Sequence, residues 1–302
     1  MTEIAPFSLP FLLLDGQPTW EMPELPSLRK LPPRATFWPF PSAETAPARL
    51  PEHSPLVRCL NGTWDFQLFD RPGDVTFEAL ASGSWRPLAV PGNWTMQLRR
   101  EKSTGPAFTM PHYTSSRMPF TALFPHVPEY TATGVYRTAL KVPAEWSGRR
   151  VILHFAGCES LLYVYLDGKF VGMNKDSRTP AEYDITKLVR AGESYQLTCV
   201  NPRFSDASYL EDQDHWRQAG IHRDVYLYST PQTYFEDIGV QVELNNDFSS
   251  ALLTLKALVR TNEPGQASGK ISGQLYDPAG VPAFAEPLAL TLPTSTDTTP
   301  LK

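Results

Sequence analysis

The densest cluster of residues capable of chemistry lies between Arg203 and Tyr226. In this stretch carboxylates and arginines alternate with large aromatic and aliphatic side chains. Charges this dense beside apolar residues are typical of a loop held by internal ion pairs and hydrogen bonds on an apolar floor. Two interpretations remain open: a structural corner whose carboxylates are neutralised by the arginines, and a site that binds a ligand. The charged side chains include Arg203, Asp206, Glu211, Asp212, Asp214, Arg217 and Arg223.

The same stretch resembles the signature of the large bacterial β-galactosidases, which are glycoside hydrolases of family two. The resemblance rests on Ser205–Asp214, Trp216 and Gly220–Val225. In that family an acid of this motif touches the galactosyl hydroxyls and helps to hold a sodium ion. The resemblance gives this role to Asp206, which is therefore a candidate substrate-binding residue and a partial sodium ligand in a completed enzyme.

A second segment, Pro111–Phe120, resembles a part of the same enzymes in which an asparagine contacts the galactosyl ring. Ser115 stands at that position here and is the second candidate substrate-binding residue. Serine offers one short hydroxyl where the asparagine amide offers an acceptor and two donors. This departure weakens the expectation that galactose is fully recognised.

Shorter pieces, Val90–Trp94, Thr133–Arg137 and Lys175–Asp184, resemble these enzymes too. The resemblance runs from Trp20 to about Ala289. It covers only the N-terminal third of a complete enzyme.

No catalytic residue is expected in this chain. A retaining glycosidase needs two carboxylates that face each other about 5 Å apart across the glycosidic bond. Glu211, Asp212 and Asp214 are neighbours on one loop and are poorly placed to flank a sugar. In the resembled family the catalytic glutamates and the magnesium ligands lie on a (β/α)₈ barrel, and no alternating strand–helix pattern is present here. The resemblance implies no cofactor for this chain alone, but magnesium and sodium for the complete enzyme.

Composition excludes several other classes of function. The 302 residues are 41% hydrophobic and 20% charged, as in ordinary soluble proteins. A net charge of −5 without a basic cluster argues against nucleic-acid or membrane partners. The early apolar run Phe7–Leu14 is too short to span a bilayer and lacks the preceding positive charge of a signal peptide. The three cysteines are typical of a reducing compartment, and the cytoplasm is expected.

The spacing of prolines and strand patterns predicts three parts. Residues 1–55 form a proline-rich extended arm, which in the resembled family runs across a subunit interface; a poorly ordered terminus is the alternative. Residues 56–229 alternate apolar and polar positions in many short segments without a long helix, which predicts an all-β jelly-roll sandwich. Asp167-Gly168 predicts a hairpin turn, and Asp184–Gly192 a short turn of helix at most.

Residues 230–302 are expected to begin a second, immunoglobulin-like sandwich. Strands are predicted over Tyr234–Leu244, Ala251–Arg260, Lys270–Tyr276 and Pro287–Leu292. Because such a sandwich needs about seven strands and about 100 residues, the second domain is expected to be incomplete.

The sequence therefore favours the sugar-binding and assembly portion of a β-galactosidase-type enzyme. Its expected partners are a β-galactoside, the missing catalytic barrel or a complementary subunit, and further copies in an oligomer. The alternative is a free-standing, non-catalytic carbohydrate-binding or subunit-association module.

Overall fold

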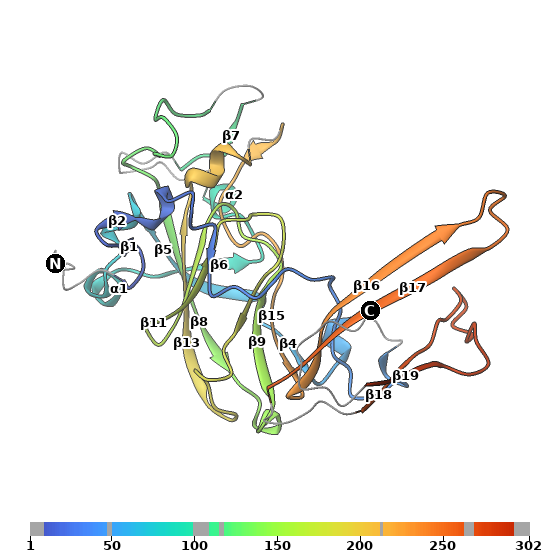
Figure 1. The fold of residues 1–302 in the computed structure, drawn as a ribbon. Coiled ribbons are helices and arrows are strands. Elements are labelled where there is room, and N and C mark those ends of the chain that lie inside the picture. Colours follow the sequence, from blue (N-terminus) through green and yellow to red (C-terminus); the bar gives the residue numbers. More distant parts are fainter. Residues whose placement is uncertain are drawn as a thin grey trace. The chain divides into compact units, whose positions relative to one another are not determined.

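In the computed structural model most of the regular secondary structure is β-strand, and the helices are short (Figure 1). The chain divides into two compact units. The first contains the chain up to Pro33, Arg58–Ser147 and Val151–Tyr228, and the second contains Arg34–Val57, Gly148–Arg150 and the chain from Ser229 onward. Among the described helices, none is long and apolar enough to cross a membrane. The structure describes residues 9–46, 50–98, 109–114, 118–211, 214–262 and 269–292.

The first unit is a sandwich of two antiparallel sheets, as the alternating pattern predicts. The larger sheet has seven strands in the order β3-β11-β10-β13-β8-β5-β6, and the smaller has four in the order β12-β9-β15-β4. In the larger sheet the bounds are β3 (Ser27–Leu28), β11 (Lys169–Asn174), β10 (Leu162–Leu166), β13 (Ser194–Pro202), β8 (Thr133–Lys141), β5 (Gly62–Phe69) and β6 (Arg86–Val90). In the smaller sheet they are β12 (Ala181–Asp184), β9 (Arg150–Phe155), β15 (Val225–Thr230) and β4 (Val57–Cys59).

Alternation along each strand creates a core between the sheets. Phe66 on β5, Tyr136 on β8 and Cys199 on β13 occupy directly paired positions, so their side chains project from one face. This face packs against Leu153 and Tyr183 of the smaller sheet, and all five side chains are fully buried.

The opposite face of the large sheet is buried as well. Tyr163 and Tyr165 on β10 pack with Leu9 and Leu12, which come from the start of the chain. The hydroxyls of Thr19 and Tyr163 lie 2.6 Å apart within a hydrogen bond. Residues 9–25 therefore form a second layer over this sheet. This layer includes β1 (Leu13–Leu14), β2 (Gln17–Pro18) and η1 (Thr19–Glu21), and the chain then joins the edge of the sheet as β3.

Short connections complete the first unit. Asp167 and Gly168 both have positive φ angles, of 47° and 74°, as the tight turn between β10 and β11 requires. Residues 185–193 form turns without a helix. Further helical elements of this unit are η4 (Pro72–Asp74), α1 (Phe77–Ser82), α2 (Trp94–Gln97) and η5 (Ala144–Trp146).

The second unit contains two separate hairpins. One joins β16 (Thr233–Leu244) to β17 (Ala251–Thr261), and the other joins β18 (Gly269–Gly273) to β19 (Leu288–Leu292). The unit also contains η3 (Pro51–His53).

Candidate functional site

Asp206 opens η6 (Asp206–Tyr209), the 3-10 turn that follows β13. Ser205 precedes this turn, and its backbone N–H donates to Oγ of Ser208 at 3.1 Å. The turn therefore has a side-chain cap at its start. Asp206 itself is 4% exposed, which is unusual for a carboxylate and requires a partner of opposite charge.

That partner is Lys175, which comes directly after β11. Its Nζ lies 2.7 Å from Oδ1 of Asp206, and the two side chains are 3% and 5% exposed. Nζ also donates to the carbonyl oxygen of Met22 at 2.7 Å. Burial raises the pKa of Asp206 while Lys175 opposes this shift, and burial lowers the pKa of Lys175 while Asp206 opposes it.

Two arginines of the Arg203–Tyr226 stretch donate hydrogen bonds to backbone carbonyl groups. Arg203 Nη2 donates to the carbonyl of Met110 at 2.5 Å, and Arg217 Nη1 donates to that of Ser208 at 3.3 Å. Both arginines are buried, and burial lowers the pKa of Arg203 to about 10. Through these bonds Arg203 holds the segment at Met110, and Arg217 joins β14 to η6. The charge partner of Asp206, Lys175, comes from the end of β11.

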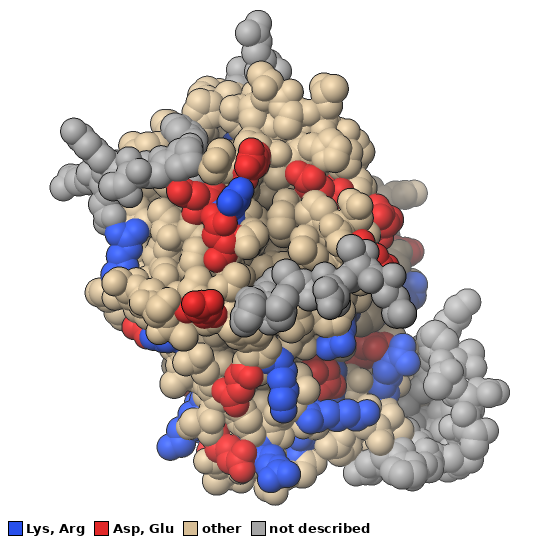
Figure 2. Space-filling model, turned by 90° about the vertical axis from the view of Figure 1, so that its left-hand side faces the viewer, with Lys and Arg blue, Asp and Glu red and all other residues tan. Residues whose placement is uncertain are grey.

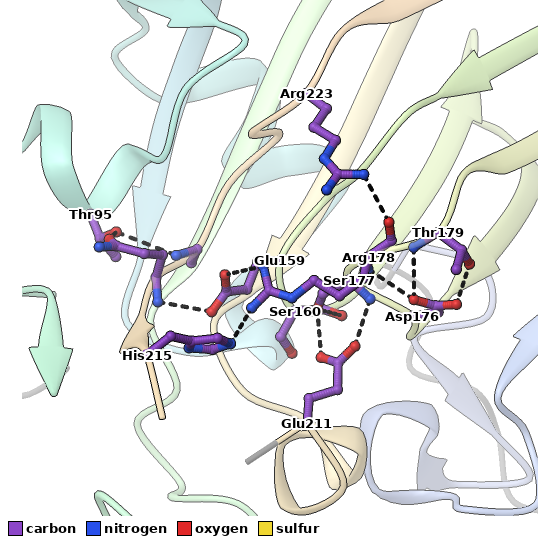
Figure 3. A network of polar contacts seen from close by, with 12 residues as sticks. Thr95, Glu159, Ser160, Asp176, Ser177, Arg178, Thr179, Glu211, His215 and Arg223 are labelled. Carbon is purple, nitrogen blue, oxygen red and sulfur yellow. Dashed lines mark hydrogen bonds and ion pairs between the residues drawn. The ribbon is translucent and has the colours of Figure 1, made fainter. Parts of the chain in front are cut away.

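A second carboxylate, Glu211, faces Ser177 (Figure 3). Its Oε1 accepts from the Ser177 backbone N–H at 2.7 Å, and its Oε2 accepts from the Ser177 hydroxyl at 2.5 Å. Burial raises the pKa of Glu211, and these hydrogen bonds oppose the shift. Next to it, Asp176 accepts from the backbone N–H groups of Arg178 and Thr179 at 2.8 and 3.0 Å. Both acids thus fix the loop after Lys175.

Glu159 and Arg178 extend this network (Figure 3). Glu159 Oε1 accepts from the backbone N–H of Gln218 at 2.9 Å, and its Oε2 lies 3.4 Å from Nη1 of Arg178. Arg178 also contacts Nε2 of His215, and its carbonyl accepts from Arg223 at 3.0 Å. The network joins the loops before β10, after β11 and around β14 (Trp216–Arg217).

Two aromatic side chains stand exposed beside η6. Tyr113 on β7 (His112–Tyr113) pairs with Trp216 on β14, and they are 47% and 57% exposed. Their ring centroids lie 6.0 Å apart, and the Tyr113 hydroxyl donates to Oδ1 of Asp214 at 2.6 Å. Such amphipathic rings offer apolar faces next to polar groups, a combination suited to stacking on a sugar.

The structure describes only part of the predicted site. Asp206 is described, whereas Ser115 and Asp212 lie outside the described residues. Lys175, Glu159 and Tyr113 were not singled out by the sequence reasoning. Lys175 opens a segment, Lys175–Asp184, that resembles the β-galactosidases, and this was the signal available for it. Within the described residues, no group of three or more His, Cys, Asp or Glu side chains could hold a metal ion.

A cavity of about 280 Å³ lies elsewhere in the first unit. Its wall includes Phe77, Trp85, Arg137, Gln196 and Thr198. Neither Asp206 nor Lys175 lines it, so the cavity is separate from the candidate site.

Comparison with a model of glycosyl hydrolases family 2, sugar binding domain, matches residues 57–231, which include Asp206 and Lys175. The chain belongs to glycosyl hydrolase family 2. The match covers both sheets of the sandwich apart from β3.

Curated proteins support the same assignment. The chain is 34% identical over 253 residues to a β-galactosidase of Priestia megaterium, a match that covers 80% of this chain and 24% of that protein. It is 33% identical over 300 residues to a β-galactosidase of Yersinia pestis, covering 92% of this chain and 27% of the relative. The chain therefore corresponds to the N-terminal part of β-galactosidase-like family 2 enzymes and spans about a quarter of their length.

Solved structures share the fold at lower sequence identity. A β-glucuronidase of Bacteroides uniformis superposes with a TM-score of 0.59 at 19% identity, covering 78% of this chain and 26% of that one. A putative β-galactosidase of Bacteroides fragilis gives a TM-score of 0.57 at 19% identity, covering 78% of this chain and 33% of that one. The fold therefore occurs in proteins named for two different sugars.

Proposed function

We propose that this chain supplies the sugar-binding and assembly portion of a β-galactosidase-type enzyme that hydrolyses terminal β-D-galactosides when complete. The observation that carries the proposal is the buried Asp206 at the start of η6, within the segment that matches the sugar binding domain. The names of the curated relatives favour galactosides over glucuronides. The catalytic carboxylates would come from a (β/α)₈ barrel in the same longer protein or in a complementary subunit, in the cytoplasm.

Asp206 would form one wall of the galactosyl pocket. Lys175 fixes the charge and position of its carboxylate through the 2.7 Å ion pair. By the same resemblance, Ser115 of the segment Pro111–Phe120 would contact the sugar ring. Hydrogen bonds that sugar hydroxyls donate to a carboxylate are stronger than those between neutral groups, so Asp206 would contribute more than Ser115.

The two metal ions that the resemblance implies fit this chain differently. Magnesium is expected on the barrel, and no group of acids or histidines among the described residues forms a site for it. Sodium is expected at Asp206. There the residues present do not fit it, because the Lys175 ammonium already lies within 2.7 Å of Oδ1.

The second unit would be the beginning of an immunoglobulin-like sandwich. In the β16–β17 hairpin, Val240, Val242 and Leu244 occupy alternate positions and are 64%, 58% and 60% exposed. Cross-strand partners such as Leu253 and Leu255 extend the same face. Further strands of a longer chain, or another subunit of an oligomer, would cover this apolar face.

No nucleic acid or membrane is proposed as a partner. On the face drawn in Figure 2, the described Asp and Glu side chains are interspersed with Lys and Arg, without a continuous basic patch. This distribution on the drawn face and the net charge of −5 do not favour binding to a negatively charged polymer or membrane surface.

A chimeric enzyme tests the proposal. In the Priestia megaterium β-galactosidase, the matched N-terminal segment is replaced by this chain, and hydrolysis of aryl β-galactosides and aryl β-glucuronides is measured. We expect hydrolysis of the galactoside by the chimera and none by the isolated chain. A correctly folded chimera that cleaves only the glucuronide, or neither substrate, contradicts the proposal.

Asp206→Asn in the chimera separates a sugar contact from a structural role. The amide keeps the shape of the side chain, so we expect kcat/KM to fall at least about tenfold. The melting temperature should fall as well, because the buried Lys175 ammonium loses its charge partner. The kinetics are therefore measured at a temperature at which the variant is fully folded. Normal kinetics with a large thermal shift would assign Asp206 to structure alone.

The second candidate is a free-standing association or carbohydrate-binding module without catalysis. The exposed apolar face of β16–β17 is the observation that favours it. This candidate is supported if the isolated chain binds galactosides and the chimera does not hydrolyse them.

A further inference from the structure

Lys175 is held at Asp206 by contacts on several sides. Its backbone N–H donates to the carbonyl of Pro26 at 3.0 Å, and the neighbouring Asn174 on β11 pairs with Ser27 on β3. The ammonium bridges Oδ1 of Asp206 and the carbonyl of Met22 at 2.7 Å each. The side chain is 3% exposed. Strand pairing and burial therefore fix this ammonium in place.

The position of Lys175 Nζ is one that a monovalent cation would otherwise take. A carboxylate and a carbonyl oxygen are oxygen ligands of the kind that hard cations prefer. A buried carboxylate without any counter-ion is strongly unfavourable, so Asp206 requires one positive charge. A second cation beside the ammonium would be repelled, because like charges interact strongly away from water.

We infer that Lys175 replaces the sodium ion at Asp206, so that this sugar site is assembled and works without sodium. The inference deepens the proposed function, and it depends on that proposal only for the expectation of sodium. It makes Lys175 a positioning residue that sets the charge and orientation of Asp206.

The test compares salts at equal ionic strength on the 302-residue chain. Thermal unfolding is followed in sodium, potassium and choline chloride, and sodium binding is followed by ²³Na relaxation. The wild-type chain should melt at the same temperature, within about 1 °C, in all three salts. Lys175→Gln removes the ammonium and leaves Asp206 without its charge partner. This variant should melt about 3–5 °C higher in sodium than in choline chloride.

Two controls isolate the site. Lys169→Gln removes an exposed lysine of the same strand β11, and should behave as the wild type does. The double variant Lys175→Gln/Asp206→Asn removes both charges and should lose the sodium response. Faster ²³Na relaxation should appear with Lys175→Gln and disappear in the double variant.

Sodium-specific stabilisation of the wild type, abolished by Asp206→Asn, overturns the inference. A folded Lys175→Gln chain that remains indifferent to sodium overturns it too. Should Lys175→Gln fail to fold, the wild-type comparison decides, since sodium binding there contradicts the inference and its absence supports it. None of these readouts needs hydrolysis, so an inactive chimera would count against the proposed function alone.

Discussion

The β8–β13 pair and the β16–β17 hairpin are both long antiparallel ladders, yet their side chains have opposite environments. β8 and β13 pair continuously from Lys141–Ser194 to Thr133–Pro202, and the described hairpin pairs from Thr233–Thr261 to Leu244–Ala251 with one register shift. Most residues of β13 are buried, whereas Leu244 at the end of β16 is 60% exposed. A hydrogen-bonded ladder alone therefore does not make a core. The two ladders differ in what packs against them. In the first unit, other residues pack against both faces of the seven-stranded sheet.

The largest effect should come from cutting a core side chain. Phe66 is fully buried between Trp94 and Tyr136, with ring centroids 6.4 and 5.0 Å away. Phe66→Ala should lower the free energy of unfolding by about 3–5 kcal/mol, because it leaves a cavity. Val242→Ala on the exposed hairpin should change it by less than about 0.5 kcal/mol. Urea unfolding followed by tryptophan fluorescence measures the free energy of unfolding of both variants. Equal decreases in the two variants would contradict the difference in burial between the two ladders.

The loss of a buried polar side chain should also cost more stability than the loss of an exposed one. Asn201 Nδ2 donates to the carbonyls of Glu159 and Leu161 at 2.9 and 2.7 Å, and Oδ1 accepts from Trp94 Nε1 at 2.9 Å. Asn201→Ala leaves these groups unpaired and should cost about 1–3 kcal/mol.

Asn245 is the matched control, since its amide bonds to Ser249 in the exposed hairpin turn. Asn245→Ala should cost less than about 0.5 kcal/mol in the same urea experiment. A larger loss for Asn245 than for Asn201 would contradict the role given to burial.

Stability of the first unit should fall on mild acidification. Burial, and then the charges of Arg178 and Arg223, lower the pKa of His222 to about 4 from its ordinary 6.5. Between pH 6.5 and pH 4, His222 is protonated in the unfolded chain but stays neutral in the folded chain. The folded state therefore loses stability relative to the unfolded state as the pH falls from 6.5 towards 4. His222→Gln should flatten this part of a plot of unfolding free energy against pH. An unchanged slope would show that other groups cause the acid sensitivity.

The smallest effect on stability, but a visible one on association, is expected at the hairpin. Val242→Lys places a charge on the apolar face of β16 and should leave unfolding within about 0.5 kcal/mol of the wild type. Light scattering should show oligomers of the 302-residue chain that shrink in this variant. If the wild-type chain is already monomeric, the apolar face of β16 is stable in water, and the proposal that this face associates is contradicted.

The sandwich could be predicted from the sequence because its strands and turns are specified by short stretches of residues. The alternation in β5 and β13 and the Asp167-Gly168 turn depend on pleat geometry and on φ angles alone. The family was predicted differently, from the resemblance of the motif around Asp206 to the β-galactosidases. The immunoglobulin-like form of the second unit remains a proposal, since its described strands form two separate hairpins.

Tertiary structure decided which distant residues became partners. Thr19 and Tyr163 are 144 positions apart in the chain, and Lys175 reaches Asp206 from the end of another strand. The proline spacing of the arm predicted an extended course, but the layer of residues 9–25 on the large sheet depends on matching apolar surfaces that no local pattern specifies. The same holds for the charge of Asp206. A carboxylate in a sequence predicts that a cation is needed once it is buried, and only the folded chain determines that Lys175 provides it.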